Sequence, residues 1–192
     1  LDEGDELSWV SMTSGNDDLL VATKKGMAIR FKETDVRAMG RTARGVKAMA
    51  LNEGDYIAGM CRLDEDHLVL TVSETGFGRL SPISDYRIQS RGGKGLVNYH
   101  TEKYGDVASI LAVDKEDDVI LISTDGTIIR IESSSIRECA RPSKGVLVMR
   151  VDGEENKVVT LARVPHEEEE VTDVPEQDAE DAEEVSETPE QE

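Results

Sequence analysis

The stretch QSRGGKG, residues 89–95, places two cations and three glycines within seven residues. Glycine has no Cβ and readily adopts positive φ, so this composition predicts a loop whose backbone can approach another group closely. Shifting the sequence by 50 residues brings two further loops into register, RTARG at residues 41–45 and RPSKG at residues 141–145. Self-similarity at a fixed period of this length indicates a repeat architecture.

Each 50-residue unit predicts four short β-strands. A unit opens with a short apolar run and a turn that ends in glycine, and Asp125-Gly126 is a strong two-residue hairpin signal. A second apolar run, the basic glycine-rich loop, a third run and a fourth run then follow. Four short strands separated by turn signals fit one blade of a propeller-like array. The predicted fold class is therefore all-β, with four-stranded blades and a repeat of about 50 residues.

The period also predicts how the chain is divided. Three blades leave sheet edges exposed, so we expect the array to be part of a longer one. The second unit is one residue short after Gly76 in this alignment, which makes Gly78 a candidate for a β-bulge. The expected parts are residues 1–13 as the end of a preceding blade, residues 14–63, 64–113 and 114–164 as blades, and residues 165–192 as a tail.

The tail is strongly acidic. It contains fourteen Asp and Glu and no Lys or Arg, which leaves 27 acidic and 22 basic residues in the rest of the chain. Because the tail has almost no apolar surface to bury, it cannot offset its ordering entropy and is predicted to be disordered. Its charge has the sign of a nucleic acid, so it could compete for a cationic surface. The other open interpretation is that it only aids solubility.

Composition narrows the classes of function. Cys61 and Cys139 lack CxxC spacing and predict small core residues in a reducing compartment. No run of eighteen apolar residues and no signal-peptide pattern occurs, so we expect a cytoplasmic protein without membrane contact. The three histidines are scattered, no metal site is expected, and no Walker-type phosphate loop is present. No convergent set of titratable residues indicates an enzyme, and no cofactor is expected.

Basic residues recur at the same positions of each unit. A charge pattern repeated at one corner of every blade predicts a line of cations, which suits a polyanion held by its backbone. Aromatic platforms for single strands are nearly absent, so duplex DNA is the expected ligand. An alternative for one set, that Arg87 and its counterparts pair with acids such as Asp85, stays open. The candidate DNA-binding residues are Arg37, Arg41, Arg44, Lys47, Arg87, Arg91, Lys94, Arg137, Arg141 and Lys144.

The loop and the repeat length together resemble the C-terminal domain of the bacterial DNA gyrase A protein. That family carries a Gln-Arg-Arg-Gly-Gly-Lys-Gly signature, the gyrase A box, in which Ser90 here replaces one arginine. The segment RFKETDVRAMGR at residues 30–41 and the acidic tail are also similar to that family. The box normally lies in the first blade, so the loop is interpreted as a degenerate copy. Its residues are Gln89, Ser90, Arg91, Gly92, Gly93, Lys94 and Gly95.

The resemblance implies a β-pinwheel, a propeller-like array whose blades borrow strands from their neighbours, of which this chain would be the last three blades and the tail. It implies sequence-nonspecific binding, bending and wrapping of duplex DNA, in support of ATP-dependent negative supercoiling by the whole enzyme. The implied partners are the rest of the gyrase A protein and the gyrase B protein, in a heterotetramer associated with the nucleoid.

The resemblance also implies that the catalytic tyrosine of the topoisomerase lies in another domain. None of Tyr56, Tyr86, Tyr99 and Tyr104 is assigned that role, and Tyr86 is expected in the core because it aligns with apolar residues of the other units. Two alternatives stay open, the related array in the DNA-cleaving protein of topoisomerase IV and a propeller-like scaffold for protein interactions. The scaffold would leave the periodic Arg and Lys unexplained.

Overall fold

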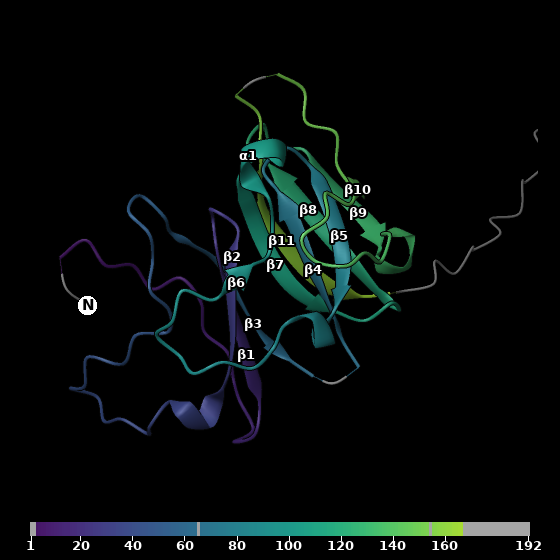
Figure 1. Ribbon diagram of the computed structural model, residues 1–192. Helices are drawn as coiled ribbons and strands as arrows, with labels where there is room; N and C mark the ends of the chain where they lie inside the picture. The colour runs from purple at the N-terminus through teal and green to yellow at the C-terminus, as the bar shows by residue number, and fades with distance from the viewer. Residues whose placement is uncertain (1–2, 65, 154, 167–192) are drawn as a thin grey trace, which may run out of the picture.

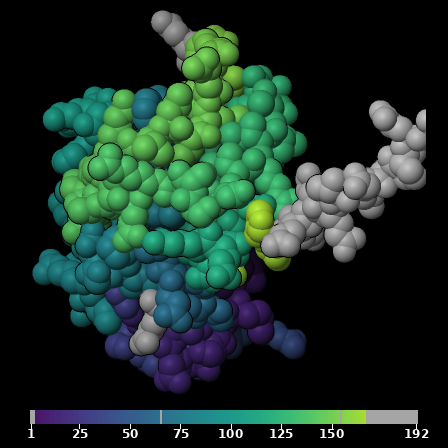
Figure 2. Space-filling model, turned by 90° about the vertical axis from the view of Figure 1, so that its right-hand side faces the viewer, coloured from purple at the N-terminus to yellow at the C-terminus, as the bar shows by residue number. Residues whose placement is uncertain are grey.

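Three antiparallel sheets follow one another along the chain in the computed structural model, which describes residues 3–64, 66–153 and 155–166 (Figure 1). Tight turns join the two strands of each hairpin, and longer connections contain a one-turn helix α1 at Thr101–Tyr104 and 3-10 turns at Glu33–Asp35, Ile83–Asp85 and Ser133–Ser135. The sheets stack in chain order from the purple end of Figure 2 to the green end. The all-β class predicted from the repeat is confirmed.

The strand order is the same in the first two sheets, and the third sheet has one strand fewer. The first sheet, in the order β3-β1-β2-β6, consists of β3 (Ile57–Leu63), β1 (Asp18–Thr23), β2 (Met27–Lys32) and β6 (Leu96–Val97). The second, given from the equivalent edge in the order β7-β4-β5-β10, consists of β7 (Val107–Val113), β4 (Leu68–Ser73), β5 (Phe77–Pro82) and β10 (Val146–Leu147). The third, in the order β11-β8-β9, consists of β11 (Val158–Pro165), β8 (Asp117–Ser123) and β9 (Ile128–Glu132).

The central hairpin of every sheet has the same register. No register shift interrupts the pairing of β4 with β5, so the expectation that the second unit is short and that Gly78 marks a bulge is wrong. The hairpin turn fixes the register, and it places Gly78 where the first unit has Ala28 and Arg79 where it has Ile29. Matching Arg79 with Arg30 by residue type alone caused the error. The equivalent outermost pairs are Asp18 with Lys32, Leu68 with Pro82 and Asp118 with Glu132.

The short fourth strand at the edge of each four-stranded sheet comes from the following unit. β6 pairs with β2, where Met27 faces Val97, and β10 pairs with β5, where Phe77 faces Leu147. The expectation that each unit supplies all four strands of its own blade is therefore wrong, because the third strand joins the sheet of the preceding unit. This is the strand borrowing that the resemblance implies. Residues 46–51, the corresponding stretch of the first unit, form no strand, and β9 has no outer partner within the described residues.

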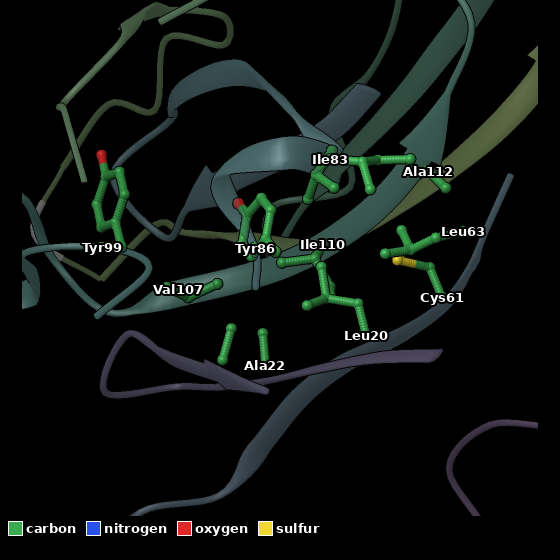
Figure 3. Packing of buried hydrophobic residues seen from close by; sticks show 12 residues of the cluster. Leu20, Ala22, Cys61, Leu63, Ile83, Tyr86, Tyr99, Val107, Ile110 and Ala112 are labelled. Carbon is green, nitrogen blue, oxygen red and sulfur yellow. The ribbon is translucent and has the colours of Figure 1, made fainter. Parts of the chain in front are cut away.

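The core lies between neighbouring sheets. Leu20 and Ala22 of β1 face Val107 and Ile110 of β7 in the cluster between the first two sheets (Figure 3). Tyr86 is fully buried there, which confirms its predicted place in the core. Burial of apolar side chains of this size contributes about 1.5–3 kcal/mol each and provides the main force that stacks the sheets.

Both cysteines were predicted as small core residues, which is confirmed for Cys61 and wrong for Cys139. Cys61 lies in the cluster between the first two sheets, whereas Cys139 is half-buried. Burial raises the pKa of the Cys61 thiol to about 12, so this cysteine is neutral and unreactive near neutral pH.

Both ends of the described chain differ from the expectations. Residues 3–13, expected as the last strand of a preceding blade, form no strand, and Trp9 lies half-exposed beside β3, β7 and β11. Pro165, expected in the tail, is the last residue of β11, and His166 Nδ1 lies 2.9 Å from Asp118 Oδ1. The rest of the predicted disordered tail, residues 167–192, lies outside the described residues. Among the residues that are described, no helix has the length and apolar character needed to cross a membrane.

Candidate nucleic-acid interface

The second and third basic loops run along β2 and β5, the second strands of the hairpins of the first and second sheets, which are called the outer strands below. The amide of Gln89 donates to the carbonyl of Arg30 in β2, and the amide of Cys139 donates to the carbonyl of Leu80 in β5, both at 2.8 Å. The two donors are 50 residues apart, and so are the two acceptors. The loops of the second and third units therefore occupy equivalent places on the outer edges of successive sheets.

One set of the predicted DNA-binding residues is exposed in the segments that lead into the three basic loops. Arg37, Arg87 and Arg137 are exposed and form no ion pair within the part of the chain that the structure describes. Asp85, the acid considered as a partner of Arg87, instead accepts a hydrogen bond from the backbone amide of Arg141. Arg41, Lys47 and Lys94 are exposed as well.

A second set, Arg91 and Arg141, is held by the protein itself. Arg91 donates from Nε to the carbonyl of Asp35 (2.9 Å) and from Nη1 to that of Lys47 (3.2 Å). Arg141 repeats both contacts 50 residues later, to Asp85 (3.0 Å) and to the carbonyl of Val97. These arginines fasten their loops to the preceding unit, a role that the sequence analysis did not predict.

The remaining two cations of the predicted set also have neighbours. Lys144 is half-buried, and its ammonium lies 3.5 Å from the centroid of the Phe77 ring and 5.5 Å from that of the Tyr104 ring. A cation over aromatic faces is attracted by the ring quadrupole. Arg44 has an interaction partner too. Lys144 is thus half-buried against aromatic rings, whereas Arg44 is exposed and has a partner within the chain.

The last glycine of each loop lets the loop lie against the outer strand. A Cβ at Gly95 would lie 2.2 Å from the carbonyl oxygen of Ala28, and one at Gly145 would lie 2.1 Å from that of Gly78. Both glycines have positive φ, 79° and 81°. Gly45 shares the conformation, with φ 83°, but no atom lies within 4 Å of its Cβ position. The glycines at 95 and 145 therefore serve the packing of one unit on the next.

Cations near the hairpin turns are neutralised, unlike those of the outer loops. Glu74 bridges Lys24 (2.6 Å) and Lys157 (2.8 Å), which belong to the first and third units, and Lys25 pairs with Asp106 (2.9 Å). Burial opposes ionisation of Glu74, but the hydrogen bonds from Lys157 and Lys24 outweigh it and lower its pKa. Unpaired positive charge is thus concentrated at the outer loops.

No cluster of three or more His, Cys, Asp or Glu side chains suited to a metal ion occurs within the described ranges.

Two further arginines, Arg30 and Arg130, also recur between units and were not predicted from the sequence. They form ion pairs with Asp18 (2.5 Å) and Asp118 (2.7 Å) inside their own hairpins. The spacing of 100 residues between the two pairs was the available signal.

Comparison with known proteins agrees with this architecture. A family model described as the DNA gyrase C-terminal domain, beta-propeller, matches residues 17–60, 67–114 and 117–165, and each stretch contains the hairpin of one sheet. The DNA gyrase A protein of Staphylococcus aureus (strain NCTC 8325) is 40% identical over 181 residues, which are 91% of this chain and 20% of that protein. The chain thus spans about a fifth of the length of the curated relatives that it matches.

Solved structures give the same result. A DNA gyrase A C-terminal domain aligns with a TM-score of 0.71 and 28% identity, covering 77% of this chain and 50% of that one. A C-terminal domain of DNA topoisomerase IV aligns with a TM-score of 0.79 and 27% identity, covering 86% and 52%. With three repeats matched in sequence and the same sheets found in solved relatives, the chain belongs to the family of DNA gyrase C-terminal domains with a beta-propeller fold.

Proposed function

We propose that this chain binds and bends duplex DNA along its outer loops, as the C-terminal domain of a gyrase A protein. The observation that carries the proposal is the recurrence of exposed Arg37, Arg87 and Arg137 without ion pairs within the described residues. In contrast, the lysines near the hairpin turns are neutralised by Glu74 and Asp106. Membership in the gyrase family supports the same ligand.

Recognition would depend on the phosphate backbone and not on base sequence. Phosphate contacts position a duplex but carry no sequence information directly. Bending stiff DNA over such a site costs about 1–6 kcal/mol, which several cation-phosphate contacts would have to offset. Arginines repeated at equivalent positions of successive units can provide these contacts one after another along a curved path. Binding of this kind depends on phosphate contacts and on the ability of DNA to bend, and it needs no base-specific contact.

The role of the domain in a whole enzyme follows from this proposal. A bent DNA segment held by the domain would be presented to a catalytic core elsewhere in the gyrase A protein, which would carry the tyrosine nucleophile. The partners would be the rest of that protein and the gyrase B protein, in the bacterial cytoplasm at the nucleoid. A topoisomerase IV protein is the second candidate, since a solved domain of that enzyme aligns over 86% of this chain.

Salt dependence of duplex binding tests the proposal against a protein-interaction scaffold. The affinity of the chain for a fluorescent duplex would be measured by anisotropy over a range of salt concentrations, with a single strand of the same sequence as the comparison. If about six phosphates are contacted, log K should fall against log[salt] with a slope near −5. No binding to the duplex, or binding independent of salt, would favour the scaffold.

The topological role needs the complete enzyme. A reconstituted gyrase whose A protein lacks residues 17–166 should relax DNA but introduce no negative supercoils. Undiminished supercoiling by that enzyme would contradict the proposed role, whatever the affinity of the isolated domain.

A further inference from the structure

The second unit is polar at five aligned positions where both neighbouring units are apolar. The hairpins share one register, so the side chains in β4 and β5 occupy the same places as their counterparts in the other sheets. The second unit has Thr71, Arg79, Ser81, Asn98 and Tyr99, the first has Val21, Ile29, Phe31, Ala48 and Met49, and the third has Leu121, Ile129, Ile131, Val148 and Met149.

Arg79 is the centre of this polar group. Its side chain is fully buried and forms no ion pair with a carboxylate within the described residues. Nε donates to the carbonyl of Ser143 at 3.0 Å, Nη1 donates to the Ser81 hydroxyl, and Nη2 donates to the carbonyl and the Oδ1 of Asn98. A buried charge is tolerated only when its hydrogen-bonding groups are satisfied, and here each guanidinium nitrogen has an acceptor.

The network ends on the backbone of the third basic loop. Besides the bond from Arg79 to Ser143, the Ser81 hydroxyl donates to the carbonyl of Cys139 (2.9 Å) and the Tyr99 hydroxyl donates to that of Lys144 (3.1 Å). Three carbonyls of residues 139–144 thus accept hydrogen bonds from buried side chains of the second unit. In the first unit the aligned side chains Ile29, Phe31 and Met49 have no group that could donate such bonds.

The group is also tied together internally. The Tyr86 hydroxyl donates to Asn98 Oδ1 (2.7 Å), and the Asn98 amide donates to Thr71 (3.2 Å). The Arg79 guanidinium lies 5.9 Å from the centroid of the Tyr99 ring. A network whose members are all satisfied holds its groups in one arrangement.

We propose that Arg79, Ser81, Asn98 and Tyr99 are positioning residues that fix the third basic loop on the second sheet. The effect on DNA rests on the proposed function, because the loop is taken to lie on the DNA path. Arg79 has no exposed surface and cannot contact DNA itself. The network therefore determines the position of Arg137 and the third basic loop relative to the second basic loop. This relative position determines how strongly the bound duplex is bent.

Two variants test the proposal. The first is Arg79→Ile, which installs the residue found at positions 29 and 129. The second copies the first unit at all five positions, Thr71→Val, Arg79→Ile, Ser81→Phe, Asn98→Ala and Tyr99→Met. The five substitutions remove the buried guanidinium together with its side-chain partners, and they leave the Tyr86 hydroxyl without its bond to Asn98. One unpaired neutral hydroxyl costs less than an unpaired buried charge, so the fold should persist even where the single variant is destabilised.

Hydrogen exchange is the first measurement, and it needs no DNA. Amides of residues 139–146 should exchange about tenfold faster in the five-residue variant, the factor expected from losing hydrogen bonds of ordinary strength. The amide of Gln89, which makes the equivalent bond in the first sheet, should exchange at the wild-type rate. Unchanged exchange in residues 139–146 would overturn the proposal. So would global unfolding of both variants, because the fold and not the loop would then depend on Arg79.

DNA bending is the second measurement. Energy transfer between dyes at the ends of a duplex should report a smaller bend with the five-residue variant, at saturating protein and with the melting temperature unchanged. An unchanged bend together with a loosened loop would overturn the stated effect on curvature. A wild-type chain that bends no DNA would count against the proposed function, and the exchange result would then decide the positioning role alone.

Discussion

The Arg91 guanidinium donates from Nε to the backbone carbonyl of Asp35 at 2.9 Å, across the boundary between the second and first units. The same bond joins Arg141 to Asp85 at 3.0 Å across the next boundary. The sequence of this loop is typical of an anion-binding motif. In the structure, Arg91 instead attaches the loop to the preceding unit, whereas Arg87 and Lys94 are exposed. Arg91 should therefore contribute to folding stability and the exposed cations to DNA affinity, and single substitutions can measure the two contributions separately.

Arg91→Ala and Lys94→Ala should have different effects, although both remove one positive charge from the same loop. Arg91→Ala should lower the free energy of unfolding by about 1–2 kcal/mol because two hydrogen bonds to backbone carbonyls of the preceding unit are lost. Lys94 is exposed, so Lys94→Ala should leave stability within about 0.5 kcal/mol and weaken duplex binding. Urea unfolding and duplex anisotropy on both variants check this, and equal stability of the two variants would contradict the fastening role.

Alanine at Gly95 or Gly145 should be far more damaging than alanine at Gly45. All three glycines have positive φ, so each substitution incurs a backbone cost of about 1 kcal/mol. At Gly95 and Gly145 the new Cβ would also collide with a carbonyl oxygen of the outer strand, whereas the space at Gly45 is open. We expect a loss of about 3 kcal/mol or more at the first two positions.

Thermal unfolding of the three glycine variants measures this difference directly. Gly45→Ala serves as the matched control because it has the conformational cost without the collision. Similar melting temperatures for all three variants would show that the loops do not lie against the outer strands as described.

The fold was largely predictable from the sequence because each unit repeats the same turns. Gly26, Gly76 and Gly126 recur at the hairpin turns, and the apolar runs on either side predict the hairpins that the structure contains. The exchange of the third strand could not be derived from the pattern, since a strand of two residues such as β6 has the same composition whichever sheet it joins. Only the resemblance to a known family implied it.

The candidate site was predictable only in part, because exposure follows from a polar loop sequence whereas contacts with backbone carbonyls do not. Exposure of Arg87 and Arg137 agrees with a position in a polar loop. The internal contacts of Arg91 and Arg141 depend on carbonyls 44 and 56 residues earlier, and backbone acceptors carry no sequence signal. Arg79 was hidden because it was matched with Arg30 by residue type, whereas the uniform shift of 50 residues and the strand register both make it the counterpart of Ile29.

The pair formed by His166 and Asp118 should make stability depend on pH. Its hydrogen bond to Asp118 raises the pKa of His166 above 6.5, and the same bond lowers the pKa of Asp118 below 3.8. The stabilisation is fully present below the unfolded pKa of the histidine and is lost as the pH rises through its raised folded value. On the acid side it is lost as the pH falls through the lowered value of the aspartate.

Melting temperatures at about pH 6 and about pH 8.5 test this pair, because the imidazole changes charge between these values. The wild-type chain should melt at a lower temperature at the higher pH. His166→Gln should remove the part of that difference that this pair causes. A difference of the same size in the variant would show that other groups are responsible.

The salt slope of duplex binding by a triple variant, Arg37→Ala, Arg87→Ala and Arg137→Ala, tests the central claim most directly. If each arginine neutralises one phosphate, the slope of log K against log[salt] should become shallower by about 3 units while the melting temperature stays unchanged. Lys25→Ala, which removes an exposed charge beside the first hairpin turn that is already paired with Asp106, should leave the slope unchanged. A triple variant that keeps the wild-type slope would contradict the account, because the exposed arginines would then not lie on the DNA path.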